Sequence, residues 1–328
     1  MEILADRARN VRSISLDKIR IDTGQGDSAY DRLSKSINVV NQEIKSRILS
    51  ILPNDKDYYI LFDQLDLGWD GKEETKRLLI GLILAARDIV REAELSKKQI
   101  HIVVFLRSDI YEGLRFEDKN KLSPDVVNIT WDDDRLGELI TKRIDVSSGG
   151  NWENVFSDTP MRNRQQQLNY IAKRTMLRPR DMIQFCTDAL NESKENNKAQ
   201  IDNNCIYAAE RPYSEYIRKE IQDETKSLEH DIDELFDVIR QIGKEVMDRD
   251  TFLEICEERN IDKPKAALQS LVDLSVLGVY QTGGVARGSR IVYRYSVESW
   301  RQLEPSAKLR VHPGLKYVLD VKSPRTAG

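Results

Sequence analysis

The sequence has few residues of the kinds that build cross-linked or metal-held scaffolds. Its 328 residues include three cysteines and three histidines, all far apart: Cys186, Cys205, Cys256, His101, His230 and His312. There is no CxxC pair and no His/Cys cluster with the spacing of zinc ligands. The sequence therefore predicts neither a disulfide framework nor a zinc site.

Long apolar runs are also missing. The longest, Leu78–Ala86, is too short for a bilayer span, which needs roughly 20 apolar residues. The first residues, MEILADRARN, are charged and lack the apolar stretch of a secretory signal. We expect a soluble, cytoplasmic protein with no membrane contact.

Basic charge is not in excess over the whole chain. The net charge of −4 predicts no general attraction to nucleic acid. Residues 278–328, however, hold nine Lys/Arg and three Asp/Glu, a net of +6, which leaves −10 for the rest. A basic tail on an acidic body favours a polyanionic or acidic partner.

Strand-like and helical segments alternate in the first part of the chain. Tyr58–Phe62, Ile100–Leu106 and Val126–Trp131 are continuous apolar runs, typical of strands covered on both faces of a parallel sheet. Apolar residues recur at helical spacing over Ser28–Leu52 and Lys72–Ala93. This alternation predicts an α/β core with a parallel sheet.

Helical periodicity dominates after the third run. Several helices are expected over 163–226, then three more over 229–274, followed by two strand-like segments around a glycine-rich turn. Three helices and a hairpin is the order of a winged helix. We therefore expect a core at 1–146, an all-helical lid at 151–228 and a winged-helix-like domain at 229–328.

Two carboxylates follow the first predicted strand in the segment YYILFDQLDLGWD. Acidic side chains at the carboxyl end of a parallel strand lie in the ligand crevice of an open α/β sheet. Asp63 is placed to hold Mg²⁺ through water, and Asp66 to position an attacking water. The alternative is that both residues cap the next helix.

A guanidinium is expected at the same edge of the sheet. Arg107 ends the next predicted strand in the segment IHIVVFLRSDIY. Its planar fork suits a γ-phosphate. The alternative is an ordinary salt bridge to Asp63 or Asp109.

A third motif, LRPRDMI, opens a predicted helix in the lid. Pro179 suits the first turn of that helix. Arg178 and Arg180 flank the proline, so either can reach a nucleotide from the lid. A plain surface role for both arginines is the alternative.

Together these motifs resemble those of P-loop ATPases. FDQLDLGWD resembles the Walker B motif, FLRSDIY the sensor 1 strand and LRPRDMI loosely the sensor 2 motif. The chain is most similar to bacterial ATPases related to the STAND, KAP and Orc/Cdc6-like AAA+ groups, in particular the Sll-type P-loop ATPase family. These are ASCE-type ATPases, and their members often serve as the nucleotide-driven module of larger proteins, including anti-phage defence proteins.

The resemblance implies a set of roles and ligands. ATP and Mg²⁺ would be the cofactors, with Asp63 as the metal-binding residue. Asp66 and Arg107 would be catalytic, and Arg180 with Pro179 would contact the nucleotide. A homo-oligomer or a multidomain assembly is also implied.

One part of the family pattern is missing. No G-x-x-x-x-G-K-[ST] occurs in the sequence, and the nearest glycine cluster, TGQGDSAY, lacks the lysine. The Walker A loop supplies the backbone amides and the lysine that hold the phosphates. MEILADRARN resembles the helix that follows this loop, and VRSISL the second strand. We expect ATP hydrolysis only where another segment supplies the loop and its strand.

The alternative function is a degenerate P-loop fold that binds DNA or protein without catalysis. Arg287, Arg290 and Arg294 surround the predicted wing and are candidate nucleic-acid contacts. A steep dependence of DNA affinity on salt would favour this alternative.

Overall fold

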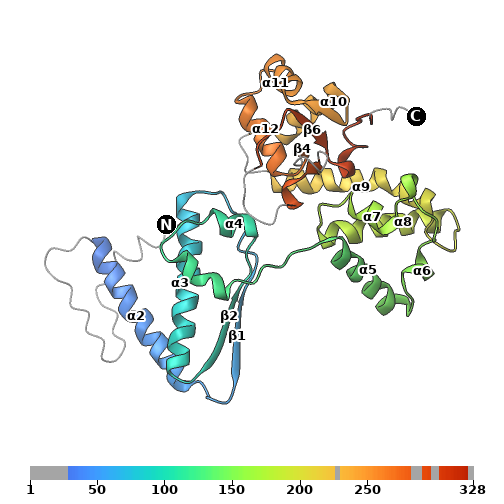
Figure 1. Cartoon of the computed structure of the whole chain (residues 1–328). Helices are drawn as coiled ribbons and strands as arrows, with labels where there is room; N and C mark the ends of the chain where they lie inside the picture. The colour runs from blue at the N-terminus through green and yellow to red at the C-terminus, as the bar shows by residue number, and fades with distance from the viewer. Residues whose placement is uncertain (1–28, 226–229, 282–289, 297–302, 324–328) are drawn as a thin grey trace. The chain divides into compact units, whose positions relative to one another are not determined.

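The computed structural model describes residues 29–225, 230–281, 290–296 and 303–323. It divides into two compact units, Met1–Ser123 and Pro124–Gly328, each described here by itself (Figure 1). The strand predicted in VRSISL and the candidate Arg287 lie outside the described residues.

The first unit contains a parallel pair of strands. β1 (Asp57–Phe62) and β2 (Gln99–Val104) pair in parallel from Asp57↔Gln99 to Phe62↔Val104. Parallel strands need a long crossover connection, and α3 (Glu73–Leu95) provides it, preceded by α2 (Ala29–Ile51) (Figure 1). The predicted α/β character with a parallel sheet is confirmed by these two strands.

Side chains of the two strands alternate between the faces of the sheet. On one face Ile100 is buried in a cluster with Leu49 and Ala93, from α2 and α3. On the other face Tyr59 and Leu61 are 67% and 61% exposed. The continuous apolar pattern predicts cover on both faces, but the described residues of the unit cover mainly one.

The predicted third strand at Val126–Trp131 is wrong. This segment has no strand structure, and Val127 and Ile129 are 85% and 74% exposed. A β-strand needs a neighbouring strand to bind its backbone N–H and C=O groups. None of the described segments pairs with it, so the apolar run alone does not produce a strand here.

The second unit begins with helices that stop where the sequence signals an end. Asp132 caps α5 by accepting from the Arg135 N–H, and Gly149 ends that helix with a left-handed φ of 66°. The first part of the helical region predicted over 163–226 is a 3₁₀ turn, η2, followed by a short helix, α7. The elements are α5 (Asp133–Ser148), α6 (Trp152–Val155), η2 (Arg162–Arg164), α7 (Gln167–Ala172), α8 (Pro179–Glu195) and α9 (Asn203–Glu224).

Three further helices and an antiparallel sheet follow. The order is α10 (Ile232–Ile242), β3 (Val246–Asp248), α11 (Arg249–Glu258), α12 (Pro264–Asp273), β4 (Leu277–Gln281), β5 (Arg290–Val292) and β6 (Lys308–Val311). The strands lie in the spatial order β3-β6-β4-β5. β4 and β5 form the predicted antiparallel pair. β5 ends at Val292, however, and continues as a 3₁₀ turn, η3 (Arg294–Ser296).

The helices and the sheet of the second unit share one hydrophobic core. Phe185 in α8, Tyr213 in α9, Phe236 in α10 and Leu309 in β6 are fully buried within the same cluster. This cluster makes 124–328 one compact unit. None of the described helices combines the length and apolarity needed to cross a membrane.

Candidate functional site

The carboxyl ends of β1 and β2 lie side by side. Phe62 pairs with Val104, and the Phe105 N–H donates to the Phe62 carbonyl at 2.8 Å, which carries the pairing one residue further. Asp63 follows β1 directly, and Arg107 follows Leu106 just beyond β2. The parallel topology therefore places the predicted acid and guanidinium beyond the same edge of the sheet.

The chain leaves β1 through tight turns. Gln64 has a left-handed φ of 58°, and its N–H donates to Asp63 Oδ1 at 2.7 Å. The Leu67 N–H then donates to the Gln64 carbonyl, and the Trp69 N–H to the Asp66 carbonyl, at 3.2 and 3.0 Å. Asp63 and Asp66 are thereby held on a turn and exposed.

Asp70, rather than Asp63 or Asp66, accepts the hydrogen bonds at the start of α3. Asp70 accepts from the Lys72 N–H at 3.0 Å and from the Thr75 hydroxyl at 2.8 Å. The hydrogen bonds of Lys72 and Thr75 hold the pKa of Asp70 well below its ordinary value. Asp63 and Asp66 precede this contact and do not take part in it. The sequence interpretation had given Asp70 no role.

A small apolar cluster lies beside the two functional segments. Leu79, Ile110 and Leu114 are buried, and Leu65 and Leu106 pack against them. Leu65 is the neighbour of Asp66, and Leu106 is the neighbour of Arg107. Burial of these two leucines fixes the backbone that carries each polar side chain. The sequence carries a signal for this packing, because Leu65 directly precedes Asp66 and Leu106 directly precedes Arg107.

The donor set at this edge suits a magnesium–phosphate complex. Among the described residues there is no group of three or more His, Cys, Asp or Glu side chains that could hold an ion alone. Mg²⁺ bound beside phosphates takes one or two carboxylates and keeps several waters. The exposed carboxylate of Asp63 fits that requirement, and the exposed carboxylate of Asp66 is available to position a water.

Arg107 is engaged with a neighbouring acid. Its Nε donates to Asp109 Oδ1 at 3.1 Å and its Nη2 to Asp109 Oδ2 at 2.8 Å. Both side chains are almost half exposed, so this ion pair contributes only about 0–1 kcal/mol. The salt-bridge alternative is thus realised with Asp109. A phosphate can still compete for the guanidinium, because charge-assisted forks to phosphate are stronger.

The lid motif lies in the second unit. Pro179 is the first residue of α8. Arg178 bonds the Glu224 carboxylate at 2.6 and 3.1 Å, and Arg180 bonds Glu220 at 3.3 Å while remaining 80% exposed. Both arginines thus contact α9, as the surface alternative expects. Asp63, Asp66 and Arg107 belong to the first unit.

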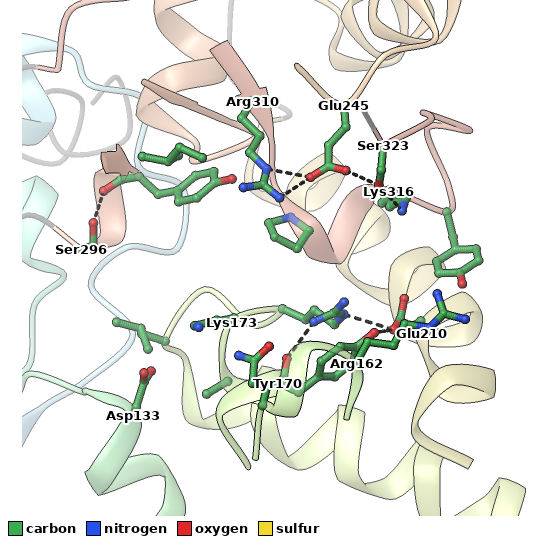
Figure 2. Close-up of a pocket in the computed structure, with 18 of the residues that line it drawn as sticks. Asp133, Arg162, Tyr170, Lys173, Glu210, Glu245, Ser296, Arg310, Lys316 and Ser323 are labelled. Carbon is green, nitrogen blue, oxygen red and sulfur yellow. Dashed lines mark hydrogen bonds and ion pairs between the residues drawn. The ribbon is translucent and has the colours of Figure 1, made fainter. Parts of the chain in front are cut away.

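Two of the three candidate arginines of the predicted wing lie among the described residues. Arg290 begins β5 and is exposed, and Arg294 lies in η3. The charge of Arg294 acts on Asp273, whose pKa burial raises. A cavity in the same unit, drawn in Figure 2, involves residues that the sequence interpretation did not select.

Comparison with known proteins gives one family match. Residues 134–222, which span most of α5 to α9, match the family described as FunZ-associated C-terminal helical domain. No curated protein matches the chain. Among solved structures the chain is similar to Cdc6p from Pyrobaculum aerophilum, with 12% identity, over 92% of this chain and 72% of that one, at a TM-score of 0.32. A likeness at that score does not establish a shared fold.

Proposed function

We propose that this chain is the Walker B and sensor part of a P-loop ATPase whose phosphate-binding loop comes from another segment. The observation that supports it is the parallel pairing of β1 and β2, which carries Asp63, Asp66 and Arg107 to one sheet edge. Ligands of open α/β sheets bind beyond this edge.

Each side chain has a role in that proposal. Asp63 would hold Mg²⁺, and Asp66 would orient the water that attacks the γ-phosphate. Arg107 exchanges Asp109 for the phosphate and stabilises the developing charge. Mg²⁺, when bound, neutralises the phosphate oxygens.

A loop-bearing strand would complete pairing that the described residues leave open. We propose that it pairs with the side of β2 that has no partner among the described residues, and that it gives Val126–Trp131 the neighbour it needs to become a strand. Pairing would satisfy backbone groups that otherwise cost about 1–3 kcal/mol each when buried. Val127 and Ile129, now exposed, would then be covered.

The domain organisation and assembly are part of the same proposal. The core at 1–146, the lid at 151–228 and the winged-helix-like domain at 229–328 would form one module of an Sll-type, STAND-related ATPase. Pro179 and Arg180 would approach the nucleotide from the lid. The module would act in a homo-oligomer or a larger protein, with phage defence as a candidate role.

ATP turnover by the complete protein, purified with its native partners, tests this proposal. Asp66→Asn should lower the turnover number about 100-fold or more, the scale of a lost catalytic group. Asp63→Asn should raise the Mg²⁺ concentration needed for half-maximal turnover. Asp55→Asn, in the loop before β1 and so at the opposite end of the strand, is the matched control and should match the unmodified protein. Undiminished turnover in Asp66→Asn would rule out the assigned acid.

A non-catalytic DNA- or protein-binding module is the second candidate. Arg290 and Lys308 are exposed on strands β5 and β6. If this sheet binds DNA, affinity should fall steeply between low and moderate salt, and Arg290→Gln should reduce the slope by about one unit. Absence of retention on DNA at low salt would remove this candidate.

A further inference from the structure

The second unit contains a cavity of about 790 Å³, open to solvent, that takes no part in the function proposed above. Ligand sites commonly measure about 300–1,000 Å³. In Figure 2, Arg162, Tyr170, Lys173 and Glu210 face a second row of residues that includes Arg310, Glu245, Lys316 and Ser323. The first row comes from the helical part of the unit and the second mainly from around the C-terminal sheet.

The lining carries a surplus of positive charge. Five cations and three acids contribute to it: Arg162, Lys173, Arg174, Arg310, Lys316, Asp133, Glu210 and Glu245. Two of the acids are already engaged within the protein. Glu245 accepts from Arg310 Nε at 2.6 Å and from Ser323 Oγ at 2.5 Å, and Glu210 pairs with Arg174 at 3.2 Å.

The guanidinium of Arg162 is held by an aromatic ring. Its Cζ lies 4.9 Å from the centroid of Tyr207, and its backbone N–H donates to the Tyr207 hydroxyl at 3.0 Å. Arg174 lies in the same way over Tyr170, at 3.3 Å. A guanidinium fixed on a ring loses little freedom on binding, and its plane suits both phosphate forks and stacking on a base.

Two further groups suit a phosphorylated ligand. Gln165 is one of the lining residues, and its side-chain nitrogen is buried without a hydrogen-bond acceptor among the described residues. Buried donors are satisfied in most proteins, so an incoming oxygen would complete this one. Tyr317 also lines the cavity, is 49% exposed and offers a ring for stacking.

We propose that this cavity binds a nucleotide: a base that stacks on Tyr317 and a phosphoryl group held by Arg162, with Lys173 adding to the positive charge of the lining. A base and one phosphate fit comfortably within the measured volume. The lining residues all belong to the second unit, so this site is separate from the edge that carries Asp63. Its occupancy does not depend on a Walker A loop.

Calorimetric titration of the full chain with AMP, GMP, CMP and UMP tests the site. The double variant Arg162→Gln/Lys173→Gln should weaken nucleotide binding about tenfold or more, because one charge-assisted contact and a further positive charge of the lining are lost. Arg164→Gln is the matched control, since Arg164 is exposed in the same 3₁₀ turn and does not line the cavity.

The stacking role is tested by comparing nucleotides with pyrophosphate. Tyr317→Ala should weaken nucleotide binding severalfold and leave pyrophosphate binding unchanged, whereas Tyr317→Phe should retain both. A 5′-phosphorylated dinucleotide distinguishes a nucleic-acid end from a free nucleotide as the source of the ligand. Tighter binding of the dinucleotide than of the mononucleotide assigns the ligand to a nucleic-acid end. Equal binding of the two assigns it to a free nucleotide. The proposal is overturned if no nucleotide binds at about 1 mM or if the double variant binds as well as the unmodified chain.

Discussion

The two units bury their apolar residues in different ways. The first has two small clusters, one around Leu49 and Ile100 and one around Leu79 and Ile110. The second has a single cluster that extends from Leu136 to Val321. Hydrophobic stabilisation grows with buried area, so the second unit holds together by itself, whereas the first exposes apolar side chains that suit a further covering element.

The candidate sites differ in the same way. At the edge of β1 and β2 the polar side chains are exposed and directly follow their strands in sequence. In the second unit the cavity is lined by residues from Asp133 to Ser323, gathered from elements far apart along the chain. A linear motif therefore marks the first site, while the second exists only once the chain has folded.

The largest expected effect tests whether the second unit has one shared core. Phe236→Ala removes a fully buried ring and should destabilise the unit by about 3–5 kcal/mol. Native-state hydrogen exchange should show lost protection in α8 and α9 as well as in α10. Val146→Ala, at a side chain that is 89% exposed, is the control and should change protection little. Loss confined to residues 232–321 would mean that the core is divided.

The next effect concerns a buried histidine of the second unit. His312 is fully buried, its Nδ1 accepts from the Gly314 N–H and its Nε2 bonds the Tyr295 hydroxyl. Burial lowers the pKa of His312 to about 3, assisted by the charges of Arg174, Arg178 and Arg310. Below pH 6.5 the histidine is protonated in the unfolded chain but stays neutral in the folded one. The contribution of His312 to the free energy of unfolding is therefore complete above pH 6.5. It is lost as the pH falls toward 3, by about 1.4 kcal/mol per pH unit.

Chemical unfolding between pH 7 and 5 measures this slope. His312→Asn should remove the histidine component, and His101→Asn in the first unit is the control. Burial raises the pKa of Asp181 to about 6. Protonation of Asp181 therefore increases the free energy of unfolding as the pH falls below 6, which is opposite in sign to the effect of His312. The difference between the unmodified chain and His312→Asn isolates the histidine, and identical slopes would contradict its assignment.

The smallest expected effect on stability belongs to the lid. Arg180→Ala should change the free energy of unfolding by less than about 0.5 kcal/mol, because its pair with Glu220 is exposed. The same variant should nevertheless weaken ATP binding by the complete protein if Arg180 contacts the nucleotide. Arg178→Ala, which removes a better-aligned pair with Glu224, is the matched comparison. An ATP affinity unchanged by Arg180→Ala would leave this residue with a surface role.

Several elements were predictable because their signals are local. The apolar stripe of Lys72–Ala93 became α3, and the run at Tyr58–Phe62 became β1. The same reasoning failed at Val126–Trp131, where strand formation depends on a neighbour. It also missed β3 and β6, which are short and depend on partners far away in the chain: β3 pairs with β6, and β6 pairs with β4 as well.

Local sequence determined the periodicity of the helices, the apolar runs that became β1 and β2, and the polar residues that follow them, because these properties depend on side-chain spacing within a few turns. The structure selected Asp109 over Asp63 as the partner of Arg107, and tertiary structure alone decided that Arg162, Lys173 and Tyr317 share a cavity. Ion pairs and cavities depend on distances between side chains, and only the packed chain specifies those distances.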